Sequence, residues 1–127
     1  EKGLVAADKD NGAVEIAGAQ VLTAIVPEVD AKALMEIGDR VKGQLGDTAA
    51  IVLGSAAEGR VHLVAAVTPA LVERGVKAGA IVKIAAQVTG GGGGGKDTMA
   101  QAGGKDPEKL PEALEAARGA IAAALGA

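Results

Sequence analysis

The sequence has 127 residues and contains no phenylalanine, tyrosine or tryptophan. A core without aromatic rings has to be packed with aliphatic side chains, mainly valine, leucine, isoleucine and alanine, and it lacks the large contact area of rings. The same absence removes the platforms on which proteins usually stack single-stranded bases. Any nucleic acid recognised by this chain is therefore expected to be a folded one, recognised by its shape.

Cysteine is also absent, which excludes disulfide frameworks and cysteine-ligated zinc or iron–sulfur sites. No apolar run approaches the roughly 18 residues of a membrane span, and no secretion signal opens the chain. These absences predict a cytoplasmic protein with no membrane partner. The length and the 49% apolar content predict one domain. The chain begins with Glu1 rather than methionine, so we expect a piece of a longer protein.

Side chains that support catalysis are scarce. His62 is the single histidine and lies among apolar neighbours in an expected strand, which favours a structural or surface role. Ser55 has no activating partner, no histidine pair can hold a metal, and the carboxylates are scattered over turns and helix faces. We therefore expect no catalytic residue, no metal site and no cofactor in this chain.

Charge is distributed unevenly, although the net charge is only −3. Residues 1–59 carry five basic and ten acidic side chains (net −5), and residues 97–127 carry three and five (net −2). Residues 60–96 have a net charge of +4, which predicts either solvated helix faces or an electrostatic rim around a binding site. In this stretch Glu73 is the one acidic residue, and the five basic residues are Arg60, Arg74, Lys77, Lys83 and Lys96.

Periodicity and turn signals predict a mixed α/β fold with one central sheet and helices packed on it. Residues 1–12 are polar and are expected to be the remnant of an upstream linker, and residues 13–127 are expected to form one globular α/β domain. The expected elements are strands over 13–17 and 19–26, a helix from Asp30 to Gly46, strands over 50–55 and 61–67 around a turn at Glu58-Gly59, helices over 70–76 and after Gly79, a glycine-rich loop over 90–105, and a helix from Pro111.

Three local signals refine the helices. Thr68 is expected to cap the helix that Pro69 opens, and Asp106-Pro107 to begin a helical turn before the last helix. Apolar stripes predict the buried faces of the last two long helices. The first stripe comprises Ile81, Ile84, Ala85 and Val88, and the second Leu110, Leu114, Ala117, Ile121 and Leu125.

The segment "GGGGGGKD", residues 90–97, fits the first seven positions of the phosphate-binding pattern G-x-x-x-x-G-K-[ST]. A nucleotide-hydrolase loop is not predicted, because such a loop joins a strand to a following helix and these glycines follow a helical stripe. Asp97 also replaces the Ser or Thr that would hold magnesium. Two alternatives are a flexible linker and an ordered surface that lets a bulky ligand approach the backbone. Met99, Ala100 and Gln101 between two glycine clusters favour the ordered surface.

The stretch "VTGGGGGGKDTMAQAGGKDPEKLPEAL" resembles the end of the C-terminal domain of alanyl-tRNA synthetases, where a glycine-rich loop precedes an M-A-Q-x-G-G stretch and a final helix. The residues upstream resemble the body of the same domain, which is of the DHH-associated type, so the likeness runs from about Ile16 to Leu125. The chain departs from the family at Lys96, Asp97 and Thr98, where the family commonly has R-P-D.

The resemblance implies a tRNA-binding module that assists aminoacylation and editing by holding the body of the tRNA. The parent would be an ATP-dependent alanine–tRNA ligase that uses ATP, magnesium and zinc in its other domains, which would be partners of this one. The implied loop and the basic rim around it predict the contact residues. They are Gly90, Gly91, Gly92, Gly93, Gly94, Gly95, Lys96, Gln101, Gly103, Gly104, Arg74, Lys77 and Lys83.

Two alternatives to this function stay open. The same type of domain resembles the accessory domain of DHH-type phosphoesterases, where it would hold a nucleic-acid substrate for another domain. The chain would otherwise be a non-catalytic module that forms a homodimer through its alanine-rich last helix, Pro111–Leu125.

Overall fold

The computed structural model describes residues 13–16, 18–26, 31–46, 48–57 and 59–126. The expected linker remnant, the expected cap Asp30 and Glu58 of the predicted turn lie outside these ranges. The described elements are β1 (Ala13–Ile16), β2 (Ala19–Ile25), α2 (Ala31–Leu45), β3 (Ala49–Ala57), β4 (Arg60–Val67), α3 (Pro69–Glu73), α4 (Ala78–Val88), β5 (Gly92–Gly95), β6 (Met99–Gly104), the 3₁₀ turn η2 (Pro107–Lys109) and α5 (Leu110–Ala124).

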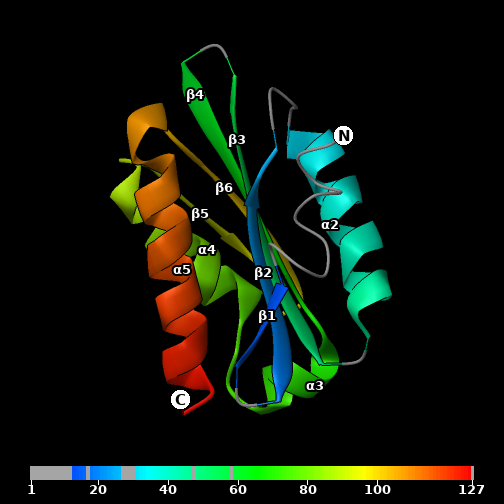
Figure 1. Cartoon of the computed structure of the whole chain (residues 1–127). Helices are drawn as coiled ribbons and strands as arrows, with labels where there is room; N and C mark the ends of the chain where they lie inside the picture. The colour runs from blue at the N-terminus through cyan, green and yellow to red at the C-terminus, as the bar shows by residue number, and fades with distance from the viewer. Residues whose placement is uncertain (1–12, 17, 27–30, 47, 58, 127) are drawn as a thin grey trace.

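In the described part of the chain, the strands form one six-stranded sheet in the order β1-β2-β3-β4-β6-β5. The β2–β3 pair is parallel and the other pairs are antiparallel, so the sheet is mixed. Helix α2 covers one face, and α4 and α5 cover the other (Figure 1). The predicted fold class, a mixed central sheet with helices packed on it, is confirmed. No described helix has the length and apolarity needed to cross a membrane.

Strand β4 shows why the middle of the sheet has almost no polar side chains. Val61 and Leu63 are buried in the cluster that includes α4 and α5, whereas Val64 is buried in the cluster that includes α2. Alternate residues of a strand point to opposite faces, so a strand covered on both sides needs apolar residues throughout. In neighbouring β3, a Cβ at Gly54 would lie 2.5 Å from Leu110 Cδ1, so the missing side chain lets Leu110 pack directly onto the sheet.

The main difference from the expected element order lies in residues 90–105, which form the β5–β6 hairpin instead of a loop. Strand β6 pairs with both β4 and β5, so the glycine-rich segment belongs to the sheet. The flexible-linker alternative is therefore wrong. Glycine has low strand propensity and no side chain that could show a period of two, which is why the pattern predicted no strand.

Two smaller expectations also need correction. Thr68 occupies the N-cap position of α3, but its hydroxyl makes no cap bond and instead accepts the Ala49 N–H at 3.1 Å. In α4, Ile84 is 38% exposed and Val82 is fully buried, because this helix packs against both α5 and the β5–β6 hairpin. The predicted stripe of α5 is confirmed: Leu110, Leu114, Ala117 and Ile121 are buried, and Leu125 packs against the same cluster.

Candidate nucleic-acid interface

Strand β5 lies at one edge of the sheet, opposite the β1 edge, and consists of four glycines, all of them exposed. It pairs with β6 alone, in a register that sets Gly92 opposite Gly103 and Gly94 opposite Gln101. Edge strands usually carry charged or bulky side chains that block further contacts. Here the edge offers bare backbone to an incoming ligand.

The glycines of this segment fall into two alternating groups. A Cβ at Gly91 or Gly93 would collide with the backbone of β6, and a Cβ at Gly95 would lie 2.8 Å from Ala100 Cα. A Cβ at Gly92 or Gly94 would meet no atom within 4 Å. The first group is therefore required for close pairing with β6, whereas the second group faces open space.

Helix α4 holds this strand in place from the protein side. The Gly91 N–H donates to the Ala86 carbonyl at 2.8 Å, and a Cβ at Gly79 would lie 3.1 Å from the Gly95 carbonyl oxygen. At the opposite end of the hairpin, the Lys96 N–H donates to the Met99 carbonyl at 2.9 Å. The glycine strand is thus anchored at both ends and supported by a helix behind it.

Gly104 packs against the body of the protein instead of facing a ligand. A Cβ at this residue would collide with the side chain of Thr89, which is fully buried at the end of α4. The Thr89 hydroxyl donates to the Ala86 carbonyl at 3.0 Å, and the Thr89 carbonyl accepts the Lys105 N–H at 2.8 Å. Of the predicted contact residues, Gly104 therefore faces the body of the protein. Gly90 ends α4 with a φ of 77°, a conformation that favours glycine.

Three lysines of the predicted rim follow the edge of β5. Lys96 is exposed in the β5–β6 turn, and Lys77 lies beside this turn because the adjacent Ala78 N–H donates to the Asp97 carbonyl at 2.8 Å. Lys83 is exposed four residues after Gly79, so it lies on the side of α4 that contacts β5. Arg74 is exposed at the end of α3, close to the C-terminal end of α5 rather than in the hairpin.

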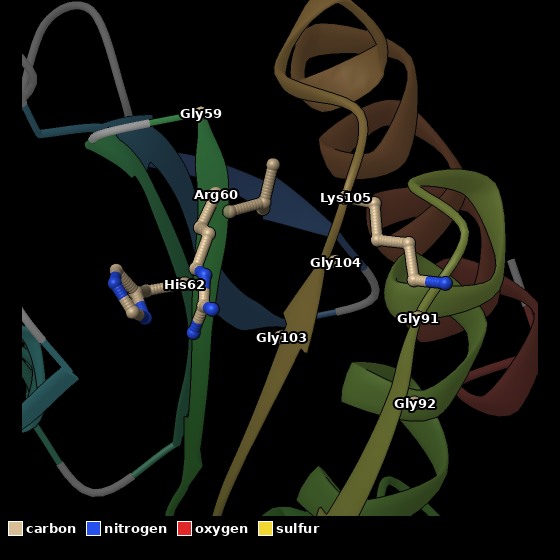
Figure 2. Close-up of a pocket in the computed structure, with 9 residues that line it drawn as sticks. Gly59, Arg60, His62, Gly91, Gly92, Gly103, Gly104 and Lys105 are labelled. Atoms are coloured by element: carbon tan, nitrogen blue, oxygen red, sulfur yellow. The ribbon is translucent and has the colours of Figure 1, made fainter.

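A hollow of about 510 Å³ opens at the start of β5, where the ends of β4 and β6 meet (Figure 2). Three of its lining residues carry nitrogen-containing side chains: Arg60 and His62 from β4, and Lys105 directly after β6. None of the described residues that line it carries a carboxylate. The remaining lining residues are Gly59, Val61, Gly91, Gly92, Gly103 and Gly104.

The geometry supports binding of an anionic ligand. The exposed backbone N–H groups of a glycine-rich segment can donate to phosphate oxygens, and lysine and arginine supply compensating charge. The described residues contain no group of three or more His, Cys, Asp or Glu side chains that could hold a metal ion.

Comparison with known protein families shows which family the chain belongs to. A family model described as the DHHA1 domain matches residues 18–123, which is most of the chain and includes the whole β5–β6 hairpin. The chain belongs to the DHHA1 domain family. The resemblance to alanyl-tRNA synthetases that the sequence indicated is confirmed by the relatives below.

The curated proteins that this DHHA1 domain resembles include alanine–tRNA ligases. The one from Synechococcus elongatus is 49% identical over 106 residues, which cover 83% of this chain and 12% of the ligase. The one from Pelotomaculum thermopropionicum is 52% identical over 101 residues, 80% of this chain and 11% of the ligase. The DHHA1 domain described here thus spans about one eighth of the length of the curated relatives that it matches.

Two solved structures share the fold of this DHHA1 domain. The crystal structure of the C-Ala domain of Aquifex aeolicus alanyl-tRNA synthetase has a TM-score of 0.79 and 24% identity, and the match covers 87% of this chain and 97% of that one. A DHH-domain protein described as a member of the s1p family of ribosomal proteins has a TM-score of 0.65 and 21% identity over 95% of this chain and 29% of its own.

The nitrogen-bearing side chains of the hollow are the residues that sequence reasoning missed. Arg60 was counted only in the basic stretch, His62 was assigned a structural or surface role, and Lys105 was not singled out. They come together because β4 pairs with β6, with His62 opposite Gly103. This register could not be predicted while the second strand was expected to be part of a loop.

Proposed function

We propose that this DHHA1 domain is the tRNA-holding module of an alanine–tRNA ligase. The identity of about 50% to ligases along most of the chain supports the assignment. Because the chain spans only a small part of those relatives, ligation with ATP and magnesium, zinc-dependent editing and a cytoplasmic location belong to the proposal for the parent. The partners are then tRNA and the remaining domains of the ligase.

The observation that carries the proposal is the exposed glycine strand flanked by lysines. Without side chains at Gly92 and Gly94, a rigid RNA surface can approach the backbone of β5 directly. Lys83 and Lys96 then contact phosphates beside the strand, and Gln101, exposed on β6, donates to a base edge or ribose. Since no phenylalanine, tyrosine or tryptophan is available for stacking, the ligand is a folded RNA recognised by shape.

Titration of the protein with tRNA at two salt concentrations tests this proposal. With three to five phosphates contacted, the logarithm of the affinity falls with the logarithm of salt with a slope of about −2 to −4.5. The double variant Lys83→Ala/Lys96→Ala weakens binding and makes the slope shallower by about 1.5. Lys32→Ala, which removes an exposed lysine from the first turn of α2, is the matched control and leaves the affinity and the slope unchanged. No binding of the wild type at low salt, or an unaffected double variant, would contradict the proposal.

The phosphoesterase alternative has one supporting observation, the structural match to a DHH-domain protein. At 21% identity that match shows the shared fold alone, whereas the ligases are about 50% identical. An Asp-His-His metal motif encoded upstream in the gene would favour the phosphoesterase over the ligase.

The homodimer alternative depended on the apolar face of the last helix. In the structure this face is buried within the chain, with Leu110, Leu114 and Ile121 in the core cluster shared with the sheet and α4. We therefore expect light scattering to report a monomer at every concentration. A mass that rises with concentration would restore the alternative.

A further inference from the structure

We propose that the hollow at the start of β5 is a phosphate-binding subsite in which Arg60 and Lys105 hold one phosphodiester group of the bound RNA, with His62 lining the hollow beside them. The choice of RNA as the ligand rests on the proposed function. The anion chemistry of the hollow rests on its own geometry and is tested separately below.

The first argument is a like-charge pair at the strand ends. Val61 of β4 pairs with Gly104 of β6, so Arg60 and Lys105 stand where the next rung of this antiparallel ladder would lie. Among the residues that the structure describes, no carboxylate forms an ion pair with either side chain. Two cations at adjoining strand ends, without an ion pair to any described carboxylate, are typical of a site that an anion completes.

The second argument is the shape of the site. Gly91, Gly92 and Gly103 contribute only backbone to its walls, which keeps the hollow open to a group as bulky as a ribose phosphate. In Figure 2 the Lys105 side chain extends toward Gly91, while the Arg60 side chain runs along β4 at the level of His62. Arg60 and Lys105 thus reach the hollow from its two sides, whereas the His62 ring points away from β6, to the other side of β4 (Figure 2). A guanidinium can donate two parallel hydrogen bonds to phosphate oxygens, and a lysine adds a point charge.

The third argument is the position of the hollow relative to the lysine turn. Gly91 borders the hollow and Lys96 lies five residues further along, at the far end of the glycine strand. At about 3.3 Å per residue, Gly91 and Lys96 are about 16 Å apart. The hollow and the lysine turn therefore contact different phosphates of one RNA, which fixes the direction in which its backbone crosses the strand.

Nuclear magnetic resonance offers a direct probe, because His62 is the only ring-bearing side chain besides the prolines. In protein labelled with ¹³C and ¹⁵N, the His62 ring gives the sole aromatic side-chain signals, even in the presence of RNA. Inorganic phosphate is titrated first and tRNA second. We expect phosphate to shift the His62 ring signals and the amide signals of Gly91 and Lys105. In Arg60→Ala and Lys105→Ala these shifts require at least tenfold more phosphate.

The matched control is Lys109→Ala, which removes an exposed lysine of η2 that does not line the hollow. We expect Arg60→Ala and Lys105→Ala each to weaken tRNA binding about tenfold and to lower the salt slope by nearly 1, with Lys109→Ala close to wild type. The subsite is refuted if phosphate leaves the His62, Gly91 and Lys105 signals in place, or if all three variants bind tRNA equally. Either result leaves the proposed function intact when tRNA binding still depends on Lys83 and Lys96. Phosphate shifts without any tRNA binding would refute the proposed function and retain the subsite.

Discussion

At the scale of single residues, several glycines lie where the chain packs too closely for a side chain. Gly54 makes room for Leu110 on the sheet, Gly79 lets α4 approach β5, and Gly93 lets β5 approach β6. A protein without phenylalanine, tyrosine or tryptophan has few large side chains with which to fill a core, so close approach of its elements takes over part of that role. Individual glycines should therefore differ sharply in their tolerance of a methyl group.

Gly93→Ala and Gly94→Ala form a matched pair for this idea. The added Cβ at Gly93 would collide with Ala102 of β6, whereas at Gly94 it would enter open space. We expect Gly93→Ala to lower the free energy of unfolding by about 1–3 kcal/mol, as overpacking usually does. Gly94→Ala should change it by less than about 0.5 kcal/mol. Urea denaturation followed by circular dichroism measures both, and equal effects would contradict the alternation described for β5.

Thr68 permits a second residue-scale prediction. Its hydroxyl accepts the Ala49 N–H at 3.1 Å, and only 6% of the residue is exposed. Thr68→Val leaves this buried donor without a partner and should cost about 1–3 kcal/mol of unfolding free energy, whereas Thr68→Ser retains the acceptor and should lose less. If both variants were equally stable, the hydroxyl would have no role in holding α3 to β3.

The same residue shows the limit of local sequence signals. Thr68 before Pro69 correctly marked where α3 begins, because both residue types favour that position in the chain. The signal could not show that the hydroxyl is used by Ala49, which is 19 residues away. Ile84 was misassigned for a similar reason, since the stripe of α4 depends on which neighbours surround the helix.

At the scale of elements, the β5–β6 hairpin is the part that the sequence predicted least well. Apolar continuity identified β3 and β4, and a period near 3.6 identified α2 and α5, because those elements bury side chains in a repeating pattern. Strand β5 buries no side chain, so it leaves no such pattern. The predicted glycines, Lys83, Lys96 and Gln101 do gather around the hairpin, but the hollow depends on strand register and was not foreseen.

Amide hydrogen exchange tests whether the hairpin is ordered in solution. The Gly91 N–H donates to the Ala86 carbonyl, and the Lys96 N–H donates to the Met99 carbonyl. We expect both amides to exchange at least tenfold more slowly than in an unstructured peptide of the same sequence, because exchange then requires local opening. Exchange at the unstructured rate across residues 90–96 would restore the flexible-linker alternative.

At the scale of the whole molecule, the fold gathers basic residues at one edge of the sheet. The chain is acidic overall, with a net charge of −3, but lysines follow the edge of β5 and cations surround the hollow at its start. An acidic body with one basic edge favours a single docking orientation on a polyanion. This arrangement agrees with a module whose task is to hold RNA rather than to act on it chemically.

The most direct test of the account is tRNA binding by the double variant Gly92→Val/Gly94→Val. Both positions face open space and neither has a positive φ, so the variant should fold with the circular dichroism spectrum of the wild type. The added side chains would hold RNA away from the strand backbone, and we predict at least a tenfold loss of affinity, about 1.4 kcal/mol. A folded variant that binds tRNA as tightly as the wild type would contradict the claim that bare backbone at the edge of the sheet is the contact surface.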